Sequence, residues 1–341
     1  MKVMVAMSGG VDSSVAAALL VKEGHDVTGV TLKLWGGDSD SGCCSVSDVD
    51  DARRVAQQLD IDHFVFNFGA DFDAHVVDPY VNDHLAGRTP NPCIECNRHL
   101  KFDRLLDRAD ILGYEILATG HHVRVASTQD GPRLARAVDT EKDQSYVLHM
   151  LDTKVISRCV FPVGSMTKAE VRDHAERLGL RTAHKAESQD VCFITRSDGR
   201  EAFLSARTSL TPGVVVDTAG RQVSTVASVE LVTIGQRRGL GLGGPGDRTF
   251  AIDVDVPAAR VTVGTAAELE RHGVELRNHV WAADPVLGPV LIQVSAHGEP
   301  VAGVIDGAGN VIWSTPQPRV APGQSVVFYA DDIVLGGAIA V

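Results

Sequence analysis

A glycine-rich turn near the start of the chain contains the residue types that bind phosphate. The sequence Ser8-Gly-Gly-Val-Asp-Ser13 follows the apolar run Val3–Met7, which predicts a buried strand, and precedes Val15–Val21, whose apolar spacing predicts a helix. Backbone N–H groups at the start of a helix attract anions, and glycines let the backbone approach them closely. A carboxylate repels bare phosphate, so Mg²⁺ or a ligand hydroxyl is the expected partner of Asp12. The chain contains no G-x-x-x-x-G-K-[ST] motif, which excludes a Walker A loop.

The pair Cys93-x-x-Cys96 is the second candidate for chemistry. The apolar spacing that begins at Phe102 predicts a helix, so Cys96 is expected at or just before a helix N-terminus, where a thiol loses its proton more readily. Four interpretations stay open from the residues: a thioredoxin-like pair, a zinc site, an iron–sulfur site completed by a distant cysteine, and a catalytic thiol. The adjacent Cys43-Cys44 has poor spacing for completing a zinc site. We favour the catalytic thiol.

A third stretch, Glu187-Ser-Gln-Asp-Val-Cys-Phe-Ile194, contains Cys192 in a short apolar run that predicts a strand after an acidic turn. Taken alone, this pattern favours a buried and unreactive cysteine. Ser8, Gly9, Gly10 and Asp12 interrupt any apolar leader at the N-terminus, so no signal peptide and a cytoplasmic location are expected. Thiols in that compartment are reduced by default, and a disulfide would be transient and catalytic.

The elements that must hold these residues alternate between strand and helix over roughly the first 200 residues. Strands are predicted at 3–7, 26–35, 64–68 and 115–119, with helices over 13–22, 48–59 and 71–86. This alternation predicts an α/β fold with a doubly wound parallel sheet. Ligands then lie at the carboxyl ends of the strands, where both the glycine-rich loop and Gly120 fall. A hairpin is expected over 123–138, and a capping box at Thr167 and Glu170 predicts a helix to about Leu178.

Beyond about residue 200, short apolar runs separated by Gly and Pro predict β-rich structure. The expected strands are 214–217, 230–234, 250–254, 290–294 and 325–329, and the one expected helix is 266–272. We therefore divide the chain into a catalytic domain at 1–200, a small central β-rich domain at 201–264 and a C-terminal β-barrel domain at 265–341.

The formal net charge of −12 argues against broad, non-specific binding of nucleic acid. It is compatible with a local basic path on an acidic body, for which the candidates are Arg88, Arg98, Lys101, Arg104, Lys142, Arg237 and Arg238. The apolar run 15–21 is far too short to span a bilayer, so no membrane association is expected.

Six motifs follow one another along the chain. They are the glycine-rich loop, Asn91-Pro-Cys-x-x-Cys-Asn97, Ala118-Thr-Gly-His121, Lys142-Asp-Gln-Ser-Tyr146, Ser188-Gln-Asp-Val-Cys-Phe-Ile194 and Gly235-Gln-Arg-Arg-Gly-Leu240. In this order they resemble the bacterial tRNA-specific 2-thiouridylase family, which belongs to the N-type ATP pyrophosphatases. The resemblance runs from about residue 3 to the C-terminus and is strongest up to about residue 255.

The resemblance implies a tRNA-uridine 2-sulfurtransferase that uses ATP and Mg²⁺. The residues implied to bind ATP are Ala6, Met7, Ser8, Gly9, Gly10, Val11, Asp12, Ser13, Leu32 and Gly120. The residues implied to contact tRNA at the anticodon loop are Asn91, Pro92, Cys93, His121, Lys142, Asp143, Gln144 and Gln324.

The resemblance also implies a mechanism with two catalytic cysteines. The enzyme would adenylate the C2 oxygen of uridine 34, the wobble base, releasing pyrophosphate. Cys192 would carry a persulfide, received from a cysteine desulfurase or a sulfur-relay protein, whose outer sulfur displaces AMP. Cys96 would then attack that persulfide and leave a Cys96–Cys192 disulfide. This is reasonable chemistry, because a persulfide is a strong nucleophile and a base in a single-stranded loop can be splayed into a pocket.

Three features depart from the family pattern, one of which is that the C-terminal domain lacks the Arg-Tyr pair common in family members. His122-Val123 stands where Tyr-Ala usually follows Gly-His, and some relatives have Asp at the position of Cys93. Cys93, Cys96 and Cys192 could instead hold an iron–sulfur cluster, which we do not favour. Two further alternatives are an adenylating enzyme that forms a C–N bond on a small molecule, and a non-catalytic RNA-binding or sulfur-relay protein.

Overall fold

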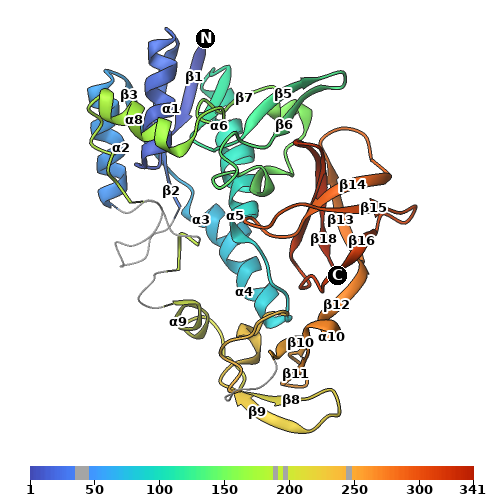
Figure 1. Cartoon of the computed structure of the whole chain (residues 1–341). Coiled ribbons are helices and arrows are strands. Elements are labelled where there is room, and N and C mark those ends of the chain that lie inside the picture. Colours follow the sequence, from blue (N-terminus) through green and yellow to red (C-terminus); the bar gives the residue numbers. More distant parts are fainter. Residues whose placement is uncertain (35–45, 187–190, 195–198, 243–247) are drawn as a thin grey trace.

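The computed structural model describes residues 1–34, 46–186, 191–194, 199–242 and 248–341. Cys43, Cys44 and the acidic turn Glu187–Asp190 lie outside the described residues. Figure 1 shows a sheet flanked by helices at the top, a small β-rich part at the bottom and a larger β-rich part at the right. None of the helices in the described ranges is long and apolar enough to cross a membrane.

The first part of the chain forms a parallel sheet in the order β3-β2-β1-β4-β7. Its strands are β1 (Lys2–Ala6), β2 (Asp26–Lys33), β3 (Asp62–Asn67), β4 (Ile116–Thr119) and β7 (Cys159–Val160). Every neighbouring pair is parallel. Parallel neighbouring strands need long crossover connections, and the chain supplies helices there. The predicted fold class is therefore confirmed.

Alternate residues of β1 point into two different cores. Val3 and Val5 pack with α1 (Val11–Lys22) and α8 (Lys168–Arg177) on one face of the sheet. Met4 packs on the other face against Leu100 and Leu105, which belong to a long helix. α2 (Val46–Gln58), which is close to its predicted bounds, packs into the first of these cores through Ala52 and Val55.

Two runs of consecutive helices cover the second face. The first comprises α3 (Gly69–Phe72), η1 (Asp73–Val77) and α4 (Asp78–Leu85), and the second comprises α5 (Pro92–Glu95), the π-helical η2 (Cys96–Arg104) and α6 (Leu105–Ile111). The side chain of Asn91 caps the second run by accepting a hydrogen bond from the N–H of Cys93. Cys96 therefore lies one turn inside a helix that begins at Pro92, and the prediction that it sits at the helix N-terminus was wrong. The reason is that proline is well tolerated in the first turn of a helix.

The expected hairpin is present as β5 (Arg124–Thr128) and β6 (Gly131–Ala135). It is followed by η3 (Tyr146–Leu148), α7 (Thr153–Ile156), β7 and α8. Both halves of the predicted capping box at Thr167 and Glu170 are formed. The strand expected around Cys192 is wrong, because the described residues 191–194 form turns.

The central part contains α9 (Gly199–Ser205), which was not predicted, and a sheet in the order β10-β11-β8-β9. The strands are β8 (Gly213–Val216), β9 (Gln222–Val226), β10 (Phe250–Asp255) and β11 (Arg260–Gly264). The predicted strand 230–234 is wrong, since the chain forms the short η4 (Val229–Leu231) there. Glu230 is buried at this turn, and both of its carboxylate oxygens accept hydrogen bonds from the N–H of Thr211.

The C-terminal part is a β-sheet in the order β12-β16-β15-β14-β17-β18-β6-β5, with β13 also paired to β18. Its strands are β12 (Glu270–Val274), β13 (Leu276–Trp281), β14 (Gly288–Gln293), β15 (Val301–Ile305), β16 (Val311–Pro318), β17 (Ser325–Ala330) and β18 (Ile333–Ala340). The predicted helix 266–272 is wrong in its second half: α10 (Ala266–Leu269) ends where β12 begins to pair with β16.

The barrel strands continue into the first part of the chain. Ile333 of β18 pairs with Ala135 of β6, so the 124–135 hairpin joins the C-terminal sheet. The hydroxyl of Tyr146 donates to the carbonyl of Ser325 at 2.8 Å, and Arg124 forms an ion pair with Asp332. These contacts hold the barrel against the parallel-sheet domain.

Candidate active site

The glycine-rich loop joins the carboxyl end of β1 to α1. Gly9 has φ +72° and presses on α2, because a Cβ there would lie 2.2 Å from the carbonyl oxygen of Asp48. Gly10 is the N-cap of α1, and its carbonyl accepts a hydrogen bond from Ser14 Oγ at 2.7 Å. A side chain at Gly9 would collide with the backbone of α2, so only glycine lets the loop pack this closely against that helix.

Two neighbouring strands bring further predicted residues to this loop. A Cβ on Gly120, directly after β4, would lie 2.5 Å from the backbone nitrogen of Ser13, so the two backbones are in contact. The N–H of Met7 donates to the carbonyl of Val30 on β2 at 2.8 Å. Leu32, two residues further along β2, is buried. The carboxyl ends of β1, β2 and β4 therefore meet where the predicted nucleotide residues lie.

Asp12 receives two contacts that the sequence did not predict. Lys168 Nζ lies 2.7 Å from both carboxylate oxygens, and His122 Nε2 lies 3.1 Å from Oδ1. Burial raises the pKa of the Asp12 carboxyl, but the hydrogen bond from His122 and the charge and hydrogen bond of Lys168 outweigh it and lower that pKa below its ordinary value. Asp12 is thus an ionised carboxylate next to an ammonium group, at the start of α1.

His121 packs inside the domain next to Thr119, whereas the side chain of its neighbour His122 contacts Asp12. His121 is only 8% exposed, and its Nδ1 lies 2.7 Å from Thr119 Oγ1. Burial, followed by the nearby charge of Lys101, lowers the pKa of His121 well below its ordinary value, so this ring is neutral at pH 7. The predicted tRNA residue His121 therefore lies inside the domain rather than on its surface.

The turn formed by residues 142–145, called here the 142–145 turn, is held from two sides. The carboxylate of Asp143 accepts hydrogen bonds from Arg136 Nε and Ser145 Oγ, at 3.0 and 2.8 Å. Ser145 Oγ also lies 3.1 Å from the hydroxyl of Tyr329 in the barrel. Gln144 is hydrogen-bonded to the backbone of His122. Of the residues in this turn predicted to contact tRNA, Asp143 and Gln144 thus also organise the protein itself.

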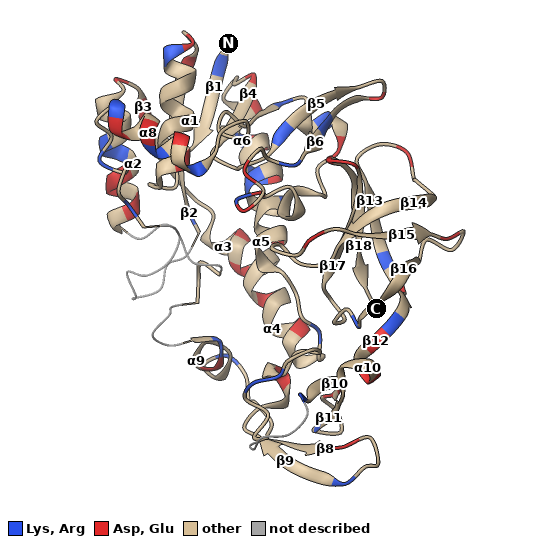
Figure 2. Cartoon of the chain, in the orientation of Figure 1, with Lys and Arg blue, Asp and Glu red and all other residues tan. Residues whose placement is uncertain are grey.

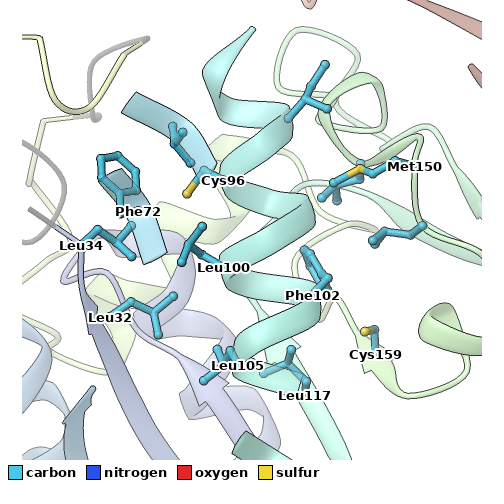
Figure 3. Close-up of a cluster of buried hydrophobic side chains, with 14 of the residues drawn as sticks. Leu32, Leu34, Phe72, Cys96, Leu100, Phe102, Leu105, Leu117, Met150 and Cys159 are labelled. Carbon is cyan, nitrogen blue, oxygen red and sulfur yellow. The ribbon is translucent and has the colours of Figure 1, made fainter. Parts of the chain in front are cut away.

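Cys96 lies in an apolar environment at the top of the long helix. Figure 3 shows it on the side of the helix that carries Leu100, facing Phe72 and Leu34, whereas Cys159 lies on the opposite side. Cys96 is 7% exposed. Cys93, one turn earlier, is half-buried. Pro92 is buried in the same helical turn as Cys93.

Cys192 belongs to the same apolar cluster as Cys96, where it is half-buried. The next residue, Phe193, is buried, and its ring centroid lies 5.5 Å from those of Phe72 and Tyr80 and 5.0 Å from that of Phe203. The structure therefore brings the two predicted catalytic cysteines, which are 96 positions apart (192 − 96), into one cluster. Within the described residues, no group of three or more His, Cys, Asp or Glu side chains is arranged to hold a metal ion.

Gln324 reaches the same region from the barrel. It lies in the β16–β17 loop, where the carbonyl of Pro322 accepts a hydrogen bond from the N–H of Thr89 at 2.7 Å. A Cβ on Gly323 would lie 2.9 Å from Cβ of Arg88. The loop that carries Gln324 therefore touches the segment that leads to Asn91 and the cysteine pair.

The basic residues proposed for a nucleic-acid path have acidic neighbours. Arg88, Arg98 and Arg104 form ion pairs with Asp83, Glu95 and Asp71, at 2.6, 3.4 and 3.0 Å. Figure 2 likewise shows positive and negative residues side by side along α2 and α8. Arg237 and Arg238 are exposed. The basic path remains a prediction.

Comparison with known proteins agrees with this arrangement. The family model described as "tRNA methyl transferase HUP domain" matches residues 1–196. The models described as "tRNA methyl transferase PRC-barrel domain" and "Aminomethyltransferase beta-barrel domain" match residues 201–265 and 271–340.

Similar curated proteins cover nearly the whole chain. The tRNA-specific 2-thiouridylase MnmA of Chloroflexus aurantiacus is 45% identical, over 98% of this chain and 97% of its own. The proteins of the same name from Roseiflexus sp. and Mycobacteroides abscessus are each 44% identical, over 98% and 99% of this chain and 98% and 99% of their own. On this similarity and on the motifs above, the chain belongs to the tRNA-specific 2-thiouridylase family.

Proposed function

We propose that this protein forms 2-thiouridine at the wobble position of tRNA, using ATP to activate the base and a cysteine persulfide to deliver sulfur. The observation that carries the proposal is one continuous apolar core that includes Leu32, at the nucleotide edge of the sheet, and Cys96, and against which Cys192 packs. The base is first activated by ATP and then attacked by sulfur, so the nucleotide site and the cysteines must act on the same base. Relatives in the same family are named tRNA-specific 2-thiouridylase, which supports 2-thiouridine as the product.

In the first step, the C2 oxygen of uridine 34 attacks the α-phosphorus of ATP. The bond to the bridging oxygen breaks, pyrophosphate leaves with the electron pair, and the N3 proton of the base is lost. The N–H groups of the loop around Gly9 and Gly10 and the ammonium group of Lys168 stabilise negative charge on the phosphates.

Asp12 is the carboxylate that would hold Mg²⁺ at this site. Magnesium in proteins is commonly bound by one or two carboxylates together with substrate phosphates, and Asp12 is ionised and 29% exposed. When bound, the ion neutralises charge on the phosphate oxygens.

In the second step, the outer sulfur of a persulfide on Cys192 attacks C2, and AMP leaves with the former C2 oxygen. Cys96 then attacks Sγ of Cys192, which breaks the sulfur–sulfur bond and sends its electrons to the sulfur now attached to C2. The products are 2-thiouridine and a Cys96–Cys192 disulfide, which an external dithiol reduces. The apolar side chains around Cys96, which is 7% exposed, limit the access of water, which would otherwise hydrolyse the adenylated base.

The test is nucleoside mass spectrometry of unmodified tRNA incubated anaerobically with the protein, ATP and Mg²⁺. One arm supplies cysteine with a cysteine desulfurase, the proposed class of sulfur donor, and another supplies sulfide. Cys96→Ala and Cys192→Ala are run beside the wild type. Cys159→Ala is the matched control, because Cys159 is buried in the same cluster and burial raises its pKa to about 12, which keeps it protonated.

We expect ATP-dependent 2-thiouridine from the wild type and from Cys159→Ala, and none from the other two variants in the desulfurase arm. Product that forms only when the protein carries iron would assign the cysteines to a cluster instead. AMP release with no thiolated base in any arm would contradict the proposal and favour an adenylating enzyme with a small-molecule substrate.

A further inference from the structure

His122 is a buried residue whose side chain contacts Asp12 of the glycine-rich loop. It follows Gly120 and His121 at the end of β4, at a position where the family pattern has Tyr. Its side chain is 3% exposed. Among the described residues its Nδ1 has no hydrogen-bond partner. Nε2 faces a carboxylate, which can only accept a hydrogen bond, so Nε2 is the nitrogen that carries the proton.

The backbone of His122 is fixed by one residue of the 142–145 turn. The N–H of His122 donates to Gln144 Oε1 at 2.8 Å, and the N–H of Gln144 donates to the carbonyl of His122 at 2.9 Å. Because these two hydrogen bonds run in opposite directions between the same two residues, the backbone of His122 has little freedom to shift. The next residue, Val123, is equally confined, because a Cβ on Gly164 would lie 1.8 Å from its carbonyl oxygen.

The side chain then connects this fixed backbone to Asp12. Nε2 lies 3.1 Å from Asp12 Oδ1, the oxygen that Lys168 Nζ also approaches, at 2.7 Å. Lys168 is a long, flexible side chain that can leave Asp12 for phosphate oxygens, whereas His122 cannot follow it. His122 is therefore the contact that holds the carboxylate in place when the ammonium group moves.

We propose that His122 is a positioning residue for the nucleotide loop, which fixes the Asp12 carboxylate through Nε2 and is itself clamped by Gln144. This inference rests on the proposed function, since it assigns ATP to the loop that contains Asp12. It also ties the turn expected to contact tRNA to the loop expected to bind ATP through one side chain.

The test compares His122→Leu with His122→Gln. Leucine fills a similar volume but donates no hydrogen bond, whereas the amide nitrogen of glutamine can take the place of Nε2. We expect His122→Leu to raise KM for ATP about tenfold, the effect of one lost hydrogen bond to a charged group, with little change in kcat at saturating ATP. His122→Gln should restore most of the affinity, and KM for tRNA should not change in either variant.

Two further measurements separate positioning from simple damage to the fold. Mg²⁺ and ATP should raise the Tm of the wild type and of His122→Gln, and raise that of His122→Leu clearly less at the same concentration. Gln144→Ala should raise KM for ATP as well, and the double variant with His122→Leu should be no worse than His122→Leu alone, since both changes act through one contact.

Equal KM values for ATP in the wild type and His122→Leu would overturn the inference, as would a Gln144→Ala variant affected only in tRNA binding. These outcomes differ from failure of the proposed function. In that case the wild type itself would form no 2-thiouridine, whereas the Tm measurement with Mg²⁺ and ATP, which needs no tRNA, would still report on His122.

Discussion

Asp12 combines a negative charge with a loop whose backbone attracts anions, and its neighbours resolve this conflict. Lys168 and His122 hold the carboxylate from two directions, at 2.7 and 3.1 Å. Before ATP binds, the ion pair between Lys168 and Asp12 keeps the positive charge of the ammonium group at the site. When phosphates enter, the same ammonium group can move to them over a short distance.

Replacing Lys168 by Met should therefore weaken ATP binding and destabilise the fold. We expect KM for ATP to rise at least tenfold, and the free energy of unfolding at pH 7 to fall by about 1.5–3 kcal/mol, the usual range for a hydrogen bond to a charged group. Urea denaturation and steady-state kinetics measure the two effects.

The loss of unfolding free energy caused by Lys168→Met should become smaller at low pH. The pKa of Asp12 is lowered in the folded protein, so the stabilisation is complete well above the ordinary value of 3.8 and is lost as the pH falls through the lower folded value. The difference between wild type and variant should be constant from pH 7 to 5 and shrink below 4. Lys154→Met, on an exposed lysine of α7, is the control and should change neither quantity. A difference that grows towards low pH would contradict this assignment.

At the scale of elements, α8 is the helix that carries Lys168 to the loop. The Thr167–Glu170 capping box begins this helix directly before Lys168, and α8 packs beside α1 on the sheet. The cap thus fixes the point from which Lys168 extends. Another capping box, formed by Thr265 with Glu268 at the start of α10, has the same two hydrogen bonds but lies in the C-terminal part.

The two caps allow a matched comparison. Thr167→Ala and Thr265→Ala should each lower the free energy of unfolding by about 1 kcal/mol, because each leaves a helix N–H group without its side-chain acceptor. Only Thr167→Ala should raise KM for ATP, by about two- to fivefold on the scale of a few tenths to one kcal/mol. Chemical denaturation and ATP titration of the two variants provide the test, and an equal KM effect in both would show that α8 does not position Lys168.

Local signals in the sequence were sufficient for many of these elements. The apolar strands, the capping box of α8 and the glycine-rich turn are all defined within a few residues, and each was predicted close to its observed position. The strand expected at 230–234 was wrong because Glu230 turns inward to accept the N–H of Thr211, a contact 19 positions away in the chain. The helix expected at 266–272 ends early because β12 pairs with β16. Non-local pairing overrode local propensity in both cases.

The same distinction applies to the site. The loop and Gly120 could be predicted to meet, because both follow strands of one parallel sheet. The contacts of Asp12 with His122 and Lys168 could not, since those residues are 110 and 156 positions away and no spacing rule connects them. Their meeting depends on how α1, β4 and α8 pack.

At the scale of the whole molecule, the parallel-sheet domain and the barrel share a buried boundary. His149 lies at this boundary and is 1% exposed, and a Cβ on Gly337 of β18 would lie 2.5 Å from its ring. Burial lowers the pKa of His149 to about 4, and its hydrogen bond to the carbonyl of Tyr146 only partly offsets this. A charged imidazolium is therefore poorly tolerated where the two domains meet.

Mild acid should consequently destabilise the protein. Between pH 6.5 and 4 the unfolded chain binds a proton at His149 that the folded chain does not, so the stability due to the neutral ring is complete above pH 6.5 and falls as the pH drops. The slope for one such group is at most about 1.4 kcal/mol per pH unit.

Urea denaturation at several pH values tests this. His149→Gln should be less stable at pH 7.5 but should lose stability more slowly down to pH 5. His184→Gln is the control, because the His184 side chain is 85% exposed, and it should keep the wild-type slope. An unchanged slope in His149→Gln would contradict the role of this residue.

The pairing of β6 with β18 also has a consequence for synthesis on the ribosome. Ala135 emerges 198 residues before its partner Ile333, the difference between the two positions. At about 5–20 residues per second, that delay is roughly 10–40 s. During this interval the edge of the 124–135 hairpin lacks the strand that completes it, and unpaired strand edges recruit other chains. A slow or stalled ribosome after residue 135 would therefore expose an aggregation-prone edge, and chaperones that bind nascent chains would have their greatest effect in that window.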